Sequence, residues 1–166
     1  MKKRDFDIAF RGLALGQHEF QYDLDDTFFT LFEYSDYRGL RGTTELNMLK
    51  SETVLDLELH FAGSIEAPCD ITNEMYTQVL KNSFVMQIKF GDEYNDENEE
   101  LLILPHGNYQ FNAAQMLYEL VVLSIPSKLL GPNAGNGLED LIEEEEDETE
   151  EKTDPRWDQL KNLLNK

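Results

Sequence analysis

Apolar and polar residues alternate along several stretches of the first hundred residues. Residues 55–61 read Leu-Asp-Leu-Glu-Leu-His-Phe, residues 84–90 place Phe, Met, Ile and Phe at alternate positions, and residues 20–24 repeat the pattern. A period of two places apolar side chains on one face of a β-strand and polar side chains on the other. Strands with one wet face are typical of antiparallel sheets.

Shorter segments of the same kind complete the predicted sheet. They are residues 6–15, 44–49, 64–71, 75–80 and 101–104. Asn73 and Glu74 lie between two of these segments and predict a hairpin turn. Gly63 interrupts the longest alternation and predicts a bulge or a bend in that strand.

The pattern changes to a helical period over residues 112–124. Asn112 is a good N-cap residue, Gln115 follows it at capping-box spacing, and Pro126 ends the run. The apolar positions at helical spacing are Ala113, Met116, Leu117, Leu120 and Val121. We expect this helix to cover the apolar face of the sheet. A shorter helix is predicted over residues 25–32, which open with two aspartates.

The C-terminal part has a different composition. Residues 131–137 are rich in glycine and asparagine, and residues 139–154 carry eleven acidic side chains and one basic one. Such a self-repelling run has no apolar surface to offset the entropy of ordering it. We therefore predict a disordered acidic linker over residues 131–154.

A short amphipathic helix is predicted over residues 155–166. Asp154 suits its N-cap and Pro155 its first turn, with Arg156 at the edge of the apolar stripe. The stripe itself consists of Trp157, Leu160, Leu163 and Leu164, at spacings of three and four. A helix this short is not stable in water without a surface to dock on. We expect these residues to be an interaction site.

Together these patterns predict an α+β protein in three parts. Residues 1–130 form a globular β-rich domain, followed by the linker and the terminal helix. The expected sheet is mainly antiparallel and strongly curled, and could approach a barrel, with one covering helix.

The charge of the chain favours some partners over others. The formal net charge is −20, and residues 1–138 alone hold twenty-two acidic and ten basic side chains. An acidic surface repels the phosphates of nucleic acids and attracts basic proteins. Tight direct binding of RNA or DNA is therefore not expected. Solubility alone is an equally good reason for such charge.

Candidate catalytic and metal-binding chemistry is sparse. One cysteine, Cys69, excludes an intrachain disulfide and a cysteine-based zinc site, and no histidine has metal-ligand spacing. Residues 92–100 could hold a divalent cation through oxygen ligands but lack the spacing of an EF-hand, so a solvated loop is favoured. We expect no metal and no cofactor. No signal peptide or membrane span is visible, which indicates a cytoplasmic protein.

Three segments carry a resemblance to a known family. They are Ala-Pro-Cys-Asp-Ile-Thr at 67–72, Leu-Val-Val-Leu-Ser-Ile-Pro at 120–126, and Asp-Pro-Arg-Trp-Asp-Gln-Leu at 154–160. In their order and spacing the chain resembles the bacterial YceD-like family, the large ribosomal RNA subunit accumulation proteins. It departs from that family at Thr72, where relatives usually have the second cysteine of a Cys-x-x-Cys, and at 127–132, which lacks the further cysteines of many relatives. On this resemblance, Cys69 is left as a packing residue.

The resemblance implies a non-catalytic, cytoplasmic factor that supports accumulation of large-subunit ribosomal RNA. The charge suggests that it acts through a basic ribosomal protein or assembly factor, or on a precursor of the large subunit. Two alternatives stay open: a carboxylate- or metal-dependent enzyme that uses residues 92–100, and a structural domain with a solubilising acidic tail.

Overall fold

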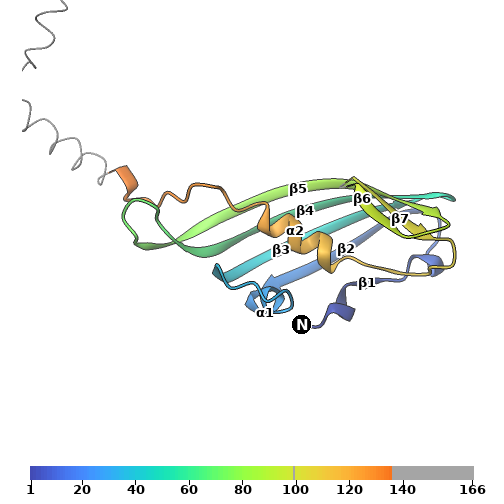
Figure 1. Cartoon of the computed structure of the whole chain (residues 1–166), viewed down its shortest axis with the longest axis horizontal. Helices are drawn as coiled ribbons and strands as arrows, with labels where there is room; N and C mark the ends of the chain where they lie inside the picture. The colour runs from blue at the N-terminus through green and yellow to red at the C-terminus, as the bar shows by residue number, and fades with distance from the viewer. Residues whose placement is uncertain (99, 136–166) are drawn as a thin grey trace, which may run out of the picture. The chain divides into compact units, whose positions relative to one another are not determined.

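The computed structural model describes residues 1–98 and 100–135. Its main feature is a six-stranded sheet with the strand order β2–β3–β4–β5–β7–β6 (Figure 1). The strands are β2 (Gly16–Asp25), β3 (Arg38–Lys50), β4 (Val54–Pro68), β5 (Met75–Gly91), β6 (Asn95–Asn98) and β7 (Leu101–Pro105). A second sheet pairs β1 (Asp7–Ile8) with β8 (Phe111–Asn112).

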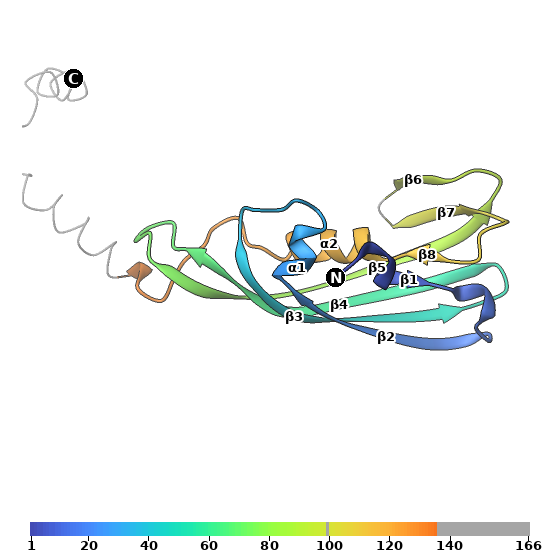
Figure 2. The ribbon, with the colours of Figure 1, turned by 90° about the horizontal axis from the view of Figure 1, so that it is seen from below.

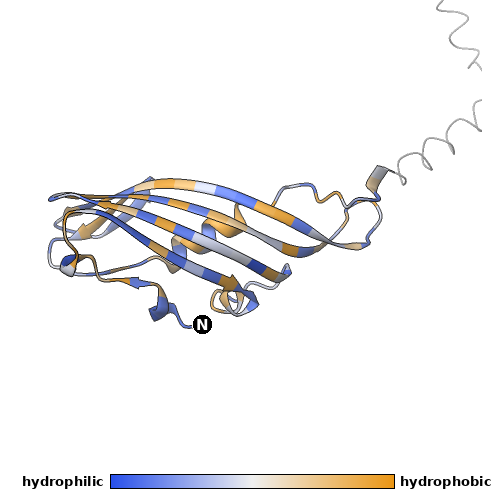
Figure 3. Ribbon diagram, turned by 180° about the vertical axis from the view of Figure 1, so that it is seen from behind, coloured by the Kyte–Doolittle hydropathy of each residue, from blue (hydrophilic) through white to orange (hydrophobic). Residues whose placement is uncertain are grey.

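Strands β2 to β5 form a continuous antiparallel meander, as their alternating sequences predict. Leu46 of β3 lies opposite Leu59 of β4, which in turn lies opposite Phe84 of β5. Because the register is kept, the apolar positions of neighbouring strands share one face of the sheet. Figure 3 shows the alternation of polar and apolar residues along these strands.

Several predicted segments merge into longer strands. Residues 55–61 and 64–71 contribute to the single strand β4, and residues 75–80 and 84–90 to the single strand β5. The turn between them, with Asn73 at a positive φ of 56°, confirms the predicted hairpin. Of the bulge or bend predicted at Gly63, the bulge is wrong, because Gly63 pairs in register with Gly42 on one side and Leu80 on the other. The bend stays a prediction.

The predicted mainly antiparallel, strongly curled sheet is wrong. The protein is mostly β-sheet, the large sheet is mixed because β5 and β7 run parallel, and neither sheet is closed or strongly curled. The parallel pair has a physical reason in the sequence after β5. Strand β6 is exposed at all four positions and suits an outer strand, whereas β7 buries Leu102 and Leu104 beside β5. β6 therefore forms an outer strand of the sheet, and β7 lies between β6 and β5 and pairs with β5.

Short elements cover one face of the sheet (Figure 2). They are α1 (Asp26–Thr30), α2 (Ala114–Val122) and the 3₁₀ turns Lys3–Phe6 and Phe10–Gly12. Aromatic rings join them: the ring centroids of Phe6 and Phe28 are 5.3 Å apart, and those of Phe32 and Tyr118 are 4.2 Å apart and stacked. These contacts close the core over the sheet.

The two helices predicted within residues 1–130 both form, but each is shorter than its sequence pattern. Asp25 caps α1 by accepting a hydrogen bond from the Thr27 N–H at 2.9 Å. Asn112 accepts from the Ala114 N–H at 3.0 Å, so it satisfies the first turn of α2 although the helix begins at Ala114. Gln115 bonds Glu119 at 2.6 Å and does not complete a capping box.

The first compact unit of the chain runs from Met1 to Gly131. The predicted linker lies outside the described residues from position 136 onward, and the predicted terminal helix over residues 155–166 lies outside them entirely. The three-part division of the chain therefore stays a prediction. None of the helices in the described part of the chain has the length and hydropathy that a membrane crossing requires.

Gly63 offers a test of the close strand pairing at the centre of the sheet. A Cβ atom placed on Gly63 would lie 2.6 Å from the Arg41 carbonyl oxygen and 2.8 Å from the Gly42 Cα. Because backbone atoms cannot move aside cheaply, Gly63→Ala should lower the free energy of unfolding by about 2 kcal/mol. Urea unfolding measures the change. Gly107→Ala is the matched control, since nothing lies within 4 Å of its added Cβ. Equal stabilities of the two variants would contradict the pairing.

Candidate binding groove

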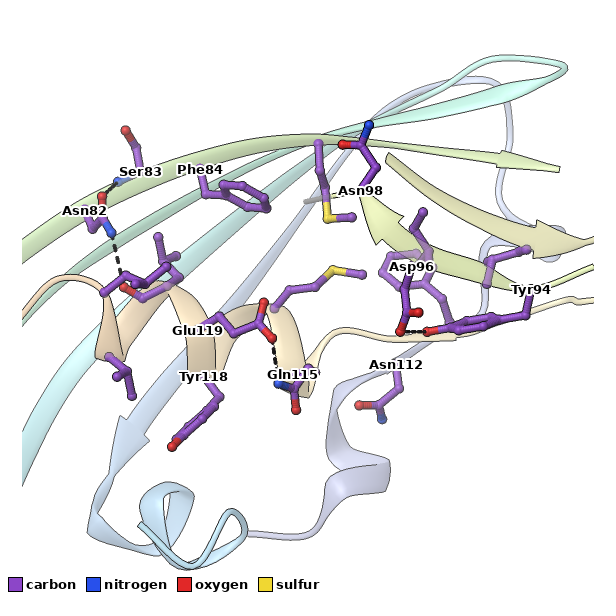
Figure 4. A pocket seen from close by; sticks show the side chains of 18 of the residues that line it. Asn82, Ser83, Phe84, Tyr94, Asp96, Asn98, Asn112, Gln115, Tyr118 and Glu119 are labelled. Carbon is purple, nitrogen blue, oxygen red and sulfur yellow. Dashed lines mark hydrogen bonds between the residues drawn. The ribbon is translucent and has the colours of Figure 1, made fainter. Parts of the chain in front are cut away.

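A groove of about 890 Å³ opens between β5, α2 and the β6–β7 hairpin (Figure 4). Its floor is apolar and is built from β5, β7, α2 and the β8 strand. The floor residues are Phe84, Met86, Leu102, Leu104, Phe111, Met116 and Leu120. Residues of α2 form one wall of the groove, and residues of β5 form the other. In the described part of the chain, Phe84 and Met116 of this floor are half-buried and its other residues are buried, so the floor continues the apolar layer that forms the core.

Hydrogen bonds hold the walls of the groove in place. The Asn82 side-chain amide of β5 donates to the Leu120 carbonyl oxygen of α2 at 3.3 Å. On the helix, Gln115 donates to the Glu119 carboxylate at 2.6 Å, which holds both side chains along the same wall (Figure 4). The spacing between β5 and α2 is therefore fixed beside the apolar floor.

The rim of the groove is polar and negatively charged. Asp96 of β6 and Glu119 of α2 supply carboxylates, and none of the described residues that line the groove is Lys, Arg or His. The Tyr94 hydroxyl donates to Asp96 Oδ2 at 3.0 Å. Partial burial, followed by the hydrogen bond and negative charge of Asp96, raises the pKa of Tyr94, which therefore stays neutral at physiological pH. An apolar floor with an acidic rim suits an apolar ligand that carries positive charge.

Among the described residues, the groove lining offers one hydroxyl nucleophile other than tyrosine, Ser83, and no histidine or lysine that could act as its base. Residues 92–100 were predicted to be a solvated loop, but they contain the exposed strand β6. Within residues 1–98 and 100–135, no three His, Cys, Asp or Glu side chains are grouped closely enough to hold a metal ion.

Cys69 lies in the turn between β4 and β5, away from the groove residues. Its side chain is 2 % exposed. The Asn73 N–H donates to the Cys69 carbonyl oxygen at 2.8 Å and closes the turn. The hydrogen bond from the Thr72 hydroxyl, aided by backbone N–H groups, lowers the pKa of the Cys69 thiol to about 7.

The Cys69 turn docks on the segment that follows α2. Asp70 donates its N–H to the Leu129 carbonyl oxygen at 2.8 Å, and its carboxylate accepts from the Leu129 N–H at 2.7 Å. This arrangement joins the two segments in which the family resemblance leads us to expect cysteines in relatives. Here hydrogen bonds hold the segments together, and the role of Cys69 as a packing residue stays a prediction.

The groove and the predicted interaction site are different parts of the chain. Asp154, Pro155, Arg156, Trp157, Leu160, Leu163 and Leu164 all lie outside the described residues. Sequence reasoning missed the groove because its floor shows the same period-two and helical patterns as a fully covered core. The dense amide side chains at 108–115 and the acids at 96–100 were the available signals.

The described residues form an open sheet with an apolar, acid-rimmed groove on its covered side. A family model described as large ribosomal RNA subunit accumulation protein YceD matches residues 57–164. Because the match spans more than half of the chain, the chain belongs to the YceD family. The family's name points to a role in accumulation of the RNA of the large ribosomal subunit and describes no enzyme. No curated protein and no solved structure matches the chain.

The hydrogen bond from Thr72 to Cys69 can be tested by titration. Thr72→Val removes the hydroxyl that stabilises the thiolate, so the pKa of Cys69 should rise from about 7 toward its ordinary value of 9.0. Ultraviolet absorbance of the thiolate as a function of pH measures the shift. Thr77→Val, an exposed threonine of β5, is the matched control.

The same hydrogen bond predicts a pH dependence of stability. A thiol with a lowered folded-state pKa contributes stability above its unfolded pKa and loses that contribution as pH falls through the folded value. The stability difference between the wild type and Thr72→Val should therefore be largest above pH 9.0 and shrink toward pH 7. A difference that is constant over this range would contradict the assignment.

Proposed function

We propose that this protein is a cytoplasmic, non-catalytic ribosome-biogenesis factor that supports accumulation of large-subunit ribosomal RNA through a basic protein partner. The observation that carries the proposal is the family match over residues 57–164, which includes the segment from Asp154 to Leu164. A basic ribosomal protein or assembly factor is the partner class that the charge favours. A precursor of the large subunit would present many such proteins.

Electrostatics support a protein partner over naked RNA. Residues 1–138 carry a net charge of −12, and residues 139–166 add a further −8. A net negative charge in both parts of the chain repels RNA phosphates and speeds encounter with a basic protein. Attraction of this kind weakens as salt rises, because exposed charges are screened.

The C-terminal segment adds apolar side chains to the electrostatic attraction. Trp157, Leu160, Leu163 and Leu164 follow at helical spacing directly after the acidic run, with Arg156 beside them. Trp and Arg are the residue types that most often dominate binding energy at protein interfaces. We infer that this segment anchors the partner after the acidic charge has attracted it.

The anchor can be tested with Trp157→Ala in the full chain. Loss of an aromatic anchor should weaken capture of large-subunit ribosomal proteins by roughly 2 kcal/mol, with little change in melting temperature. Affinity capture followed by identification of the bound ribosomal proteins, together with thermal unfolding, measures both effects. Leu15→Ala is the matched control, because Leu15 is an apolar side chain that is 60 % exposed in the described part of the chain.

The outcomes separate the competing explanations of the terminal segment. A lower melting temperature with capture unchanged would mean that Trp157 stabilises its own chain. In cells, depletion of the protein should lower large-subunit ribosomal RNA relative to small-subunit RNA. Unchanged RNA levels after depletion would contradict the proposed function itself.

A further inference from the structure

Strand β5 has one side that is paired along most of its length and one that is not. On the first side, β4 pairs with β5 from Met75 to Lys89. On the second side, β7 pairs only with Gln87–Gly91. Among the described residues, no strand pairs with Met75–Met86 on that side. We call this unpaired side of Met75–Met86 the β5 edge.

The backbone groups that point to the β5 edge follow from one hydrogen bond. The Gln87 N–H donates to the Glu100 carbonyl oxygen at 2.8 Å, so the backbone of Gln87 is directed away from β4. Successive residues of a strand direct their backbone groups to opposite sides. The backbone groups of Lys81, Ser83 and Val85 therefore point to the β5 edge, and those of the residues between them bond to β4.

Two side chains already occupy part of this edge. The Ser83 N–H donates to Asn82 Oδ1 at 2.9 Å, and Gln78 Nε2 donates to the Val79 carbonyl oxygen at 2.8 Å. No described residue accepts a hydrogen bond from the N–H of Lys81 or Val85 on this side. The Asn82 side chain also donates to the Leu120 carbonyl oxygen of α2, so the edge is closed at the Ser83 N–H. The edge is thus satisfied in part and open in part.

The β5 edge borders the groove. Asn82, Ser83, Phe84 and Met86 line the groove, and β7 begins at Leu101 in the sheet position that continues past this edge. A strand added beside residues 81–85 would lie in line with β7. Its alternate side chains would enter the groove, and the others would lie on the outer face of the sheet.

We propose that the β5 edge accepts an extended segment of the partner protein in which basic and apolar side chains follow one another. The inference rests on the proposed function for the identity of the partner and adds where and how it binds. The side chains that enter the groove meet an apolar floor and the carboxylates of Asp96 and Glu119, and the lining residues that the structure describes include no cation. Backbone hydrogen bonds to Lys81 and Val85 fix the segment in register.

Exposed apolar side chains on β5 also favour the addition of a strand at the β5 edge. Val79 and Val85 are 64 % and 60 % exposed on the outer face. An exposed β-branched edge is a site for strand pairing unless it is blocked. Lys81 lies between them on the same face and would repel a cationic side chain of the added strand there. The basic side chains of the segment are therefore expected on the groove side.

The probe is a peptide of about eight residues in which lysine alternates with valine, long enough to pair with residues 81–85 of the β5 edge. Titrated into the full chain, it should shift the backbone amide resonances of Lys81, Ser83 and Val85 in nuclear magnetic resonance spectra. A peptide with glutamate in place of lysine should bind at least about tenfold more weakly. A lysine–valine peptide methylated at alternate backbone nitrogens should also lose binding, because it lacks the donors that pair with β5.

Val85→Pro removes one backbone donor from the β5 edge. Proline is tolerated where the N–H of an edge strand faces outward. This variant should weaken binding of the lysine–valine peptide by about tenfold while the protein remains folded. The double variant Asp96→Asn with Glu119→Gln tests the rim without altering the backbone, and should reduce the preference for lysine over glutamate.

Gln21→Pro in β2 is the matched control at the opposite edge of the sheet. The Ser51 N–H bonds the Val54 carbonyl oxygen, so the alternate residues of β3, including Glu45, bond toward β4. Gln21 is the β2 partner of Glu45, and its backbone therefore faces away from β3. This variant should bind the peptide as the wild type does.

Three results would overturn the inference: no shift at the β5 edge amides, equal binding of the methylated peptide, or edge shifts that depend on protein concentration without peptide. The last would assign the edge to a second copy of the chain. Failure here is distinct from failure of the proposed function. If depletion lowers large-subunit RNA but the peptide does not bind, only the proposed edge site is wrong. If the peptide binds but depletion leaves the RNA unchanged, only the proposed function is wrong.

Discussion

The structure depends on the need to cover one apolar face of a long antiparallel meander. Leu46, Leu59 and Ile88 lie on that face and are fully buried. Burial of apolar area of this kind is the dominant favourable term in folding. The covering layer is assembled from short pieces, α1, α2 and the N-terminal 3₁₀ turns, which aromatic contacts join. Every other feature follows from how far this layer extends.

The groove and the β5 edge have the same origin in unequal lengths. β5 spans Met75–Gly91, whereas β7 spans Leu101–Pro105 and α2 spans Ala114–Val122. Among the described residues, the shorter elements leave one side of β5 without a paired strand beside the groove. Backbone donors, an apolar floor and two carboxylates are therefore adjacent there. The Cys69 turn, in contrast, is closed on both sides by hydrogen bonds to its own chain.

Local patterns predicted the local elements. The alternation around Leu59 and Phe84 defined β4 and β5, and the helical spacing around Leu117 and Leu120 defined α2. The parallel pairing of β7 with β5 could not be predicted, because the sequence 101–104 suits a strand of either direction. The position of β7 in the sheet also depends on β6 being an outer strand. The groove escaped prediction since Phe84 and Met116 fit a covered core equally well. Whether a face is covered depends on the lengths of elements far apart in the sequence.

Hydrogen exchange in the full chain, without any partner, tests most directly whether one side of β5 is open. The amides of Leu80, Asn82 and Phe84 bond to β4 and should exchange slowly, while those of Lys81 and Val85 should exchange fast. We expect alternating protection along this strand. Equal, strong protection of all five amides would show that this side of β5 is covered, and an open β5 edge would then be wrong.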